Sequence, residues 1–182
     1  MNRTDLSSFN NTWFKPGGNA LKRLCWYFTN AIWFNSAFPV SRFKVFLLRL
    51  FGAKIGKGVV IKPRVNIKYP WKLSLGNNVW IGEEVWIDNL GNVTIGDSVC
   101  LSQGAMLLCG NHDYKKQTFD LVVRDIVLED GVWIGAKATV CPGMTCHSHS
   151  VLAVGSVATS NLEAYKIYQG NPATIVRERK IQ

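Results

Sequence analysis

Histidine is the side chain best suited to exchange a proton at neutral pH, and His112 has the most informative surroundings of the three histidines in this chain. It stands in the run Cys109-Gly110-Asn111-His112-Asp113-Tyr114, whose glycine and short polar residues are typical of a loop. A loop histidine can take a proton from a hydroxyl group while that oxygen attacks a carbonyl carbon. We therefore predict that His112 is a general base and that Asp113 could orient its ring; the alternative is a histidine that only bonds the backbone.

Cys109 offers a rival mechanism, because a thiol three residues from a histidine could attack the carbonyl and carry the acyl group itself. The chain has five cysteines, an odd number without the spacing of a disulfide framework, which indicates a reducing cytoplasm. Cys141 and Cys146 are expected to be small packing residues of a repeat rather than metal ligands.

A six-residue repeat from Ile55 to Ser160 must position these residues. Each unit opens with an aliphatic residue, continues with a small or polar residue, and has a small or β-branched residue at its fifth place. We expect places one and five to point inward and the small residue at place two to let the chain turn. This period predicts a parallel β-helix, in which three units form one triangular coil and coils stack about 4.8 Å apart. Units open at residues 55, 61, 67, 75, 81, 87, 95, 101, 107, 128, 134, 140, 146 and 152.

Extra residues interrupt the repeat at three places, between the units that open at 67 and 75, at 87 and 95, and at 107 and 128. When the units are grouped by threes, every insertion follows the third unit of a coil, so the inserted residues protrude from one corner. The longest insertion, loop 109–127, is of a length that is usually functional. We predict that an acceptor molecule binds at this corner, with ordinary polar turns as the alternative. The expected contacts are Asp88, Asn89, Asn92, Asp113 and Tyr114.

Two helices are expected before the repeat, at 20–36 and 41–51, because apolar residues recur there at spacings of three and four. Polar residues interrupt the first helix, and its apolar run is too short to span a membrane. One interpretation is that the helices cover the first coil of the β-helix, since a terminal repeat needs a cap. The other is an amphipathic surface that contacts a membrane through aromatic residues flanked by lysine and arginine.

The net charge is +9, with 21 basic and 12 acidic residues. A basic surface attracts polyanions such as the phosphates of coenzyme A, nucleotide-linked or lipid-linked sugars, or an anionic membrane face. Nucleic acid is not expected as a partner, because no dense cluster of lysine and arginine and no recognition motif accompanies the charge.

The combination of this repeat, the His112 loop and the run Gly170-Asn171-Pro172-Ala173 resembles the hexapeptide-repeat acyltransferases over residues 52–180, and among them the O-acetyltransferases of colanic-acid-type exopolysaccharide biosynthesis. The resemblance implies an all-β, left-handed parallel β-helix with N-terminal helices, a protruding catalytic loop and a short C-terminal helix. The expected divisions are an N-terminal helical cap at 1–51, the β-helix at 52–160, and a C-terminal segment and helix at 161–182.

The resemblance also implies the activity: transfer of an acetyl group from acetyl-CoA to a sugar hydroxyl by direct attack, with His112 as the base and no metal. In such proteins acetyl-CoA lies between two subunits of a homotrimer. The acceptor would be a sugar or glycolipid, and the protein would be cytoplasmic, with a possible peripheral contact to the inner face of the membrane. The positions that match the donor site are Ser102, Trp133, Gly135, Ala136, Gly155, Thr159, Asn171, Arg177 and Lys180. Coil-turn geometry and a solvated basic tail are the alternatives for the glycines and the last two cations.

Some residues depart from the family pattern. Ser160-Asn161 replaces a frequent Lys-Asp pair, which leaves one basic contact to coenzyme A in doubt. Three other functions stay open: acetylation of a different hydroxyl such as that of an antibiotic, a non-catalytic scaffold, and a zinc hydratase of the γ-carbonic-anhydrase kind. His147 and His149 would share one face in the last case, but the pattern brings no third histidine near them.

Overall fold

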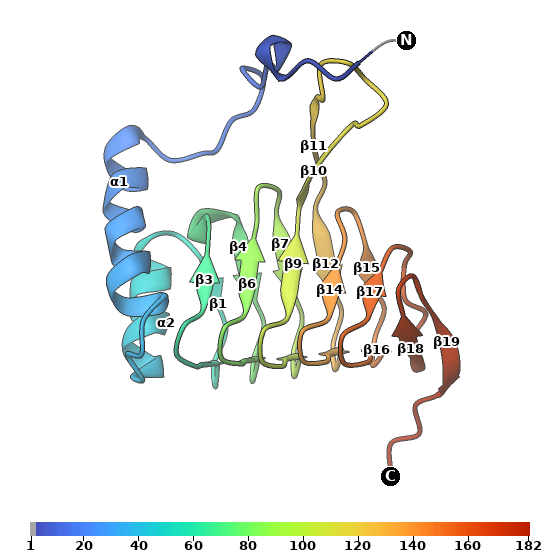
Figure 1. Cartoon of the computed structure of the whole chain (residues 1–182). Coiled ribbons are helices and arrows are strands. Elements are labelled where there is room, and N and C mark those ends of the chain that lie inside the picture. The colour runs from blue at the N-terminus through green and yellow to red at the C-terminus, as the bar shows by residue number, and fades with distance from the viewer. Residues whose placement is uncertain (1–2) are drawn as a thin grey trace.

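Three parallel sheets wind together into a β-helix that forms most of the molecule (Figure 1). The computed structural model describes residues 3–182, so residues 1 and 2 of the expected N-terminal region lie outside it. The first sheet contains β1 (Lys54–Ile55), β4 (Leu73–Leu75), β7 (Val93–Ile95), β12 (Ile126–Leu128) and β15 (Thr145–Cys146). The second sheet contains β2 (Val60–Ile61), β5 (Trp80–Ile81), β8 (Cys100–Leu101), β13 (Trp133–Ile134), β16 (Val151–Leu152), β18 (Lys166–Gly170) and β19 (Ala173–Glu178). The third sheet contains β3 (Asn66–Ile67), β6 (Trp86–Asp88), β9 (Met106–Leu108), β14 (Thr139–Val140) and β17 (Val157–Ala158).

The interior of the β-helix is built from places one and five of the repeat, as the sequence predicted. Ile81 and Val85, which hold these places in one unit, are completely buried. The backbone bonds run from coil to coil: the amide of Val60 donates to the carbonyl of Val79, and that of Lys62 donates to Ile81, each at 2.9 Å. Each coil therefore satisfies the polar backbone of its neighbour.

The expected role of place two is wrong, because the chain turns at place four. Place four has positive φ in most units, including at residues with side chains such as Arg64 (56°) and Glu84 (60°). Where place two is glycine, the reason is different: a Cβ on Gly82 would lie 2.9 Å from the carbonyl oxygen of Leu101 in the next coil. At Gly82, stacking of the coils rather than backbone conformation excludes a side chain.

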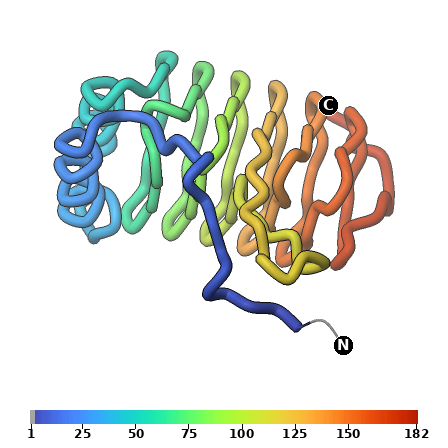
Figure 2. The backbone as a smooth tube through the Cα atoms, turned by 90° about the horizontal axis from the view of Figure 1, so that it is seen from above, coloured from blue at the N-terminus to red at the C-terminus, as the bar shows by residue number. Residues whose placement is uncertain are grey.

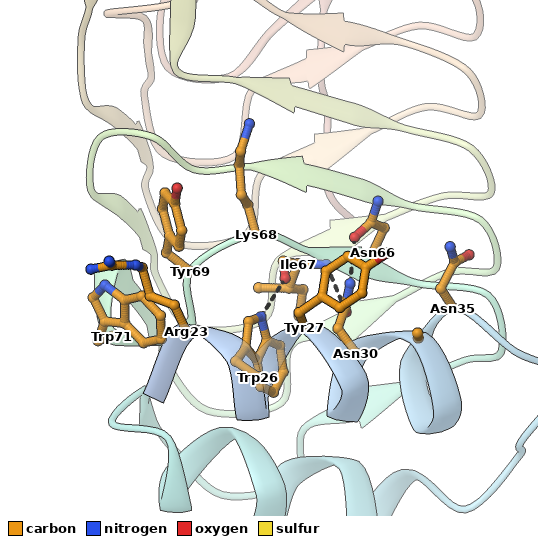
Figure 3. Close-up of a pocket in the computed structure, with 11 residues that line it drawn as sticks. Arg23, Trp26, Tyr27, Asn30, Asn35, Asn66, Ile67, Lys68, Tyr69 and Trp71 are labelled. Atoms are coloured by element: carbon orange, nitrogen blue, oxygen red, sulfur yellow. Dashed lines mark hydrogen bonds between the residues drawn. The ribbon is translucent and has the colours of Figure 1, made fainter. Parts of the chain in front are cut away.

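The N-terminal helices cover the first coil, the arrangement that the capping interpretation describes. They are α1 (Ala20–Thr29), continued by the π-helical turn η2 (Asn30–Phe34), and α2 (Ser41–Leu50). Buried Trp26 donates its indole N–H to the carbonyl of Ile67, and Asn30 bonds both Asn66 and the amide of Ile67 (Figure 3). These bonds replace the missing coil at the open end of the third sheet. Within residues 3–182 no helix is long and apolar enough to cross a membrane.

The insertions all leave the β-helix between the third and the first sheet, as predicted. We call this edge the insertion corner (residues 68–72, 88–92 and 109–125). The first insertion forms the short helix η3 (Pro70–Lys72). The third forms an antiparallel hairpin of β10 (Gly110–His112) and β11 (Leu121–Val123), which projects from the body in Figure 1.

The expected C-terminal helix is wrong. Residues 173–178 form β19, which pairs antiparallel with β18 and closes the end of the second sheet. The β-branched run Thr174-Ile175-Val176 suits a strand, and the pairing satisfies an edge that would otherwise be bare. The expected boundary at residue 160 is also too early, because Leu162 bridges Cys146 and Tyr168 pairs with Leu152 in a further partial coil.

Candidate functional site

His112 ends strand β10, and the hairpin fixes the orientation of its imidazole. Nδ1 lies 2.9 Å from the carbonyl oxygen of Phe119, so Nδ1 carries the hydrogen and Nε2 is left as the basic nitrogen. The ring of Phe119 stacks on the imidazole, with centroids 4.4 Å apart and planes 8° from parallel. The backbone carbonyl of Phe119 therefore plays the orienting part that the sequence analysis offered to Asp113.

Asp113 instead serves the hairpin turn, where its carboxylate accepts the amide of Lys115 at 3.1 Å. Tyr114 is exposed at the same turn. Both stand beside His112 in the chain, and their contact with an acceptor stays a prediction.

A hollow of about 370 Å³ lies beside His112. Its wall combines the hairpin with the following coils, through Asn111, Arg124, Cys141 and Thr159. The structure thus brings Thr159, predicted for the donor, to the same hollow as the predicted base. Arg124 carries a permanent charge at this wall, and the sequence analysis missed it because a lone arginine in a long loop has no distinguishing motif.

The N-terminal arm, residues 3–19, also reaches this site. It begins beside the tip of the hairpin, where the amide of Asp5 donates to the carbonyl of Gln117 at 2.9 Å. The ring of Phe9 then packs against His112 with centroids 5.6 Å apart. Figure 2 shows the arm running from the helical cap across the insertion corner to the hairpin. No pattern in the sequence predicts this contact, because it joins residues about a hundred positions apart.

The three polar residues predicted from the second insertion all bond to other residues of the insertion corner. Asn89 is completely buried, and its amide bonds both the N–H and the carbonyl of Tyr69, so its predicted contact with an acceptor is wrong. Asp88 pairs with Lys68 at 2.8 Å. Exposed Asn92 bonds Asp125 through its backbone and its side chain. Asp88 and Asn92 stay predictions for the acceptor, now with these partners in place.

The residues predicted for the donor lie mainly on another side of the same chain. Trp133 in β13 donates its indole N–H to the hydroxyl of Ser102 at 2.9 Å. Gly135, Ala136 and Gly155 follow strands of the second sheet, at the corner between the second and third sheets. A Cβ on Gly155 would meet nothing within 4 Å, so the surface above it is open. Within one chain, the predicted donor groove and His112 are therefore at different corners.

The C-terminal candidates lie on the β18–β19 hairpin or after it. Asn171 is exposed at the hairpin turn, Arg177 is exposed in β19, and Lys180 is exposed beyond it. Arg179, by contrast, is tied down, because its guanidinium donates to the carbonyls of Gly131 and His149. Contacts of the two exposed cations with an anion stay predictions.

Cys109 is unsuited to be a nucleophile. Its side chain is completely buried, and this burial raises the pKa of the thiol to about 12. A thiol with this pKa supplies almost no thiolate at neutral pH, and the reactive form is the thiolate. The geometry therefore favours direct attack by the acceptor over an acyl-cysteine.

The other two histidines have local partners. His147 Nδ1 lies 3.0 Å from a carboxylate oxygen of Glu129, and the ring of His149 stacks on Tyr165 with centroids 4.8 Å apart. Across residues 3–182 the structure groups no three histidine, cysteine, aspartate or glutamate side chains in a way that could hold a metal ion.

Among proteins of known sequence, the chain is similar to the acetyltransferase WcaF of Escherichia coli K12, named for colanic acid biosynthesis. The two are 42% identical over 176 residues, which cover 96% of this chain and 97% of the relative. It is also 25% identical to the galactoside O-acetyltransferase of the same organism, over 72% of this chain and 66% of that protein. No family model matches the chain.

Solved structures show the same architecture. A galactoside acetyltransferase in complex with coenzyme A superposes with a TM-score of 0.77 at 25% identity, covering 88% of this chain and 82% of that one. A hexapeptide-repeat acetyltransferase of Vibrio cholerae complexed with acetyl coenzyme A gives 0.72 at 25% identity, covering 78% and 79%. Together with the coils and the projecting histidine hairpin, the similarity along nearly the whole chain shows that this protein belongs to the hexapeptide-repeat acetyltransferases, in the family of the colanic acid biosynthesis enzyme WcaF.

Proposed function

We propose that this acetyltransferase moves the acetyl group of acetyl-CoA onto a sugar hydroxyl of a surface-polysaccharide precursor, with His112 as the general base. The observation that carries the proposal is the bond between His112 Nδ1 and the carbonyl of Phe119. It leaves Nε2 as an acceptor of protons at the wall of an open hollow. The relatives support the two substrates, since solved neighbours hold acetyl-CoA or coenzyme A and named relatives acetylate a galactoside or serve colanic acid biosynthesis.

The reaction follows from this arrangement. Nε2 takes the proton of the acceptor hydroxyl while its oxygen attacks the thioester carbonyl, and the bond to sulfur then breaks. The imidazolium formed on His112 is stabilised by the Phe119 carbonyl, and it can return the proton to the departing thiolate. The acetyl group passes directly from sulfur to oxygen, without a protein-bound intermediate.

A homotrimer would bring together the two parts of the site, the predicted donor groove and the His112 hairpin, which lie at different corners of one chain. The outward side chains of the first sheet are mainly polar, such as Lys54, Ser74 and Thr94. Those of the second and third sheets are mainly apolar, with Asn66 and Thr139 as exceptions, and include three exposed tryptophans: Trp80, Trp86 and Trp133. Burying these two faces against neighbouring copies removes apolar surface from water. In such an assembly the His112 hairpin of one subunit would face the donor groove of the next.

The test is release of free thiol from acetyl-CoA in the presence of candidate saccharides. His112→Ala should lower kcat by about 10²-fold to 10⁴-fold, the usual contribution of a general base. The matched control is His147→Ala, which removes a half-exposed histidine from another coil and should leave turnover within about twofold. Acceptor-dependent turnover at the wild-type rate in His112→Ala would contradict the assignment.

A further inference from the structure

The helical cap has a second, outer face that the rest of the described chain leaves uncovered. Leu21, Leu24, Phe28 and Ile32 follow one another at spacings of three and four, which places them on one side of α1 and η2. Each of the four is more than half exposed. The opposite side of the same helix carries Trp26, which is buried against the first coil.

Helix α2 extends this apolar face. Phe46 and Leu50 are 58% and 66% exposed and lie one helical turn apart. Phe46 stacks on Phe43 with centroids 6.4 Å apart, and Phe43 contacts Trp33 of η2 at 5.1 Å. A continuous row of rings thus joins the two helices. We call this surface the outer cap face; it consists of Leu21, Leu24, Phe28, Ile32, Phe46 and Leu50.

The charge of the protein is concentrated at the same end. Residues 6–82 contain twelve lysines and arginines and neither an aspartate nor a glutamate. Residues 83–182 contain eight basic and eleven acidic residues, so the remaining coils have a slight negative charge. Figure 1 shows that residues 20–82 form the helices and first coils at one end of the β-helix. The positive charge is therefore polarised along the axis, toward the end that carries the outer cap face.

A hollow of about 440 Å³ between α1 and the first coil has the same character (Figure 3). Its wall includes the rings of Tyr27 and Tyr69 and the cations Arg23 and Lys68, of which Lys68 is paired with Asp88. None of the lining residues is acidic. This combination of cations and phenol rings suits the phosphate and polar headgroup of a lipid beside an apolar surface.

We propose that the outer cap face docks the protein in the plane of an anionic lipid membrane. Exposed leucine and phenylalanine side chains would enter the boundary between headgroups and acyl chains, and the surrounding cations would meet lipid phosphates. A second copy bound cap to cap would instead bring two strongly basic ends together, which opposes that contact. The proposal concerns attachment alone and does not depend on the acetyl acceptor or on His112.

Co-sedimentation of the full chain with vesicles tests this attachment. Vesicles of neutral phosphatidylcholine are compared with vesicles that also contain phosphatidylglycerol, at about 0.1 M and 0.5 M salt. We expect binding to the anionic vesicles, weaker binding at high salt, and little binding to the neutral ones. The triple variant Leu21→Gln, Leu24→Gln and Phe28→Gln should bind at least about tenfold more weakly, with its thermal unfolding unchanged because these side chains are already exposed.

Two further variants separate the two forces. Arg42→Gln, Lys54→Gln and Lys57→Gln remove three exposed cations near the cap and should also weaken binding to anionic vesicles about tenfold or more. Val176→Gln and Ile181→Gln remove exposed apolar side chains from the far end and should bind as the wild type does. Undiminished binding by the leucine–phenylalanine variant would overturn the proposal. So would loss of oligomer mass by light scattering in that variant together with no vesicle binding by the wild type, since the face would then be a subunit contact.

Discussion

Phe119 makes two contacts with the imidazole of His112: its backbone carbonyl accepts the Nδ1 hydrogen, and its side chain covers the ring. The two contacts have different consequences. The carbonyl selects the tautomer, whereas the phenyl ring limits rotation of the imidazole. Only the second contact depends on the type of residue 119.

Phe119→Leu should therefore separate positioning from protonation. The carbonyl remains, so the pH profile should keep its midpoint, while kcat should fall about threefold to tenfold because a stacked aromatic contact is lost. The KM for acetyl-CoA should change less than kcat, since Phe119 supports the imidazole and is not among the residues predicted to bind the donor. A large rise in KM with unchanged kcat would contradict a positioning role.

Phe9 should also help to position the imidazole of His112, through the contact made by the N-terminal arm. Phe9→Ala removes the contact of the N-terminal arm with His112 and should lower kcat/KM a few-fold, without lowering Tm, because the arm adds little to the core. Leu6→Ala is the control, since Leu6 is exposed on the same arm and is not among the ring contacts of His112. Equal losses in both variants would indicate a general effect of the arm rather than the Phe9 contact.

Cys109→Ala should keep kcat within about twofold, because the buried thiol is protonated at neutral pH and takes no part in direct transfer. The cost should fall on stability, at about 1 kcal/mol for a small cavity in the core. Steady-state turnover and urea unfolding measure the two effects. An acetylated Cys109 found by mass spectrometry during turnover would restore the covalent mechanism.

The buried ammonium of Lys44 should make the free energy of unfolding depend on pH. Lys44 is a completely buried residue of α2; its ammonium donates to the carbonyl of Lys62 in the first coil, and burial lowers its pKa to about 8. Between pH 8 and the ordinary lysine pKa of about 10.4, the unfolded chain binds more protons than the folded one. The contribution of Lys44 to the free energy of unfolding therefore rises with pH in this window, by on the order of 2 kcal/mol, and is flat below it.

Comparison with Lys44→Met at each pH isolates this contribution. Methionine fills a similar volume without a charge, so the variant should be the more stable protein at pH 7, and its advantage should shrink as the pH approaches 10. Urea unfolding at pH 7 and pH 10 gives the difference directly. A difference that is the same at both values would show that Lys44 does not change its protonation.

Two glycine substitutions test why glycine occurs at place two and at place four of the repeat. Gly82→Ala would push a Cβ against the next coil and should cost about 1–3 kcal/mol. Gly155→Asn lies at φ 67° with open space around it, and asparagine tolerates this region, so the cost should stay below about 1 kcal/mol. Thermal unfolding of both variants checks the order, and a reversed order would refute these roles.

The sequence predicted the structure correctly where a residue type has a single structural role. Aliphatic residues at places one and five predicted the core, and the three insertions predicted the corner that carries His112. Glycine at place two was misinterpreted because the same residue serves both a turn and a close backbone approach. The turn at place four could not be predicted from Arg64 and Glu84, because arginine and glutamate do not indicate a positive φ.

The parts of the site that the sequence did not predict depend on contacts that residue type does not determine. The partner of His112 is a backbone carbonyl, which every residue at position 119 would supply. Phe9 reaches the site only because the arm crosses the insertion corner. The β-branched residues Thr174, Ile175 and Val176 favour the C-terminal strand that the structure contains, whereas the family resemblance implied a helix there.

The number of coils sets the distance along the axis between the helical cap and His112. Two coil steps separate the capped first coil from the coil that precedes the His112 hairpin, and each step adds about 4.8 Å along the axis. With the cap resting on a lipid surface, this count sets the height of the base above the headgroups. Adding or removing one coil would shift His112 by one fixed increment, and thereby change which sugar along a membrane-anchored chain it can reach.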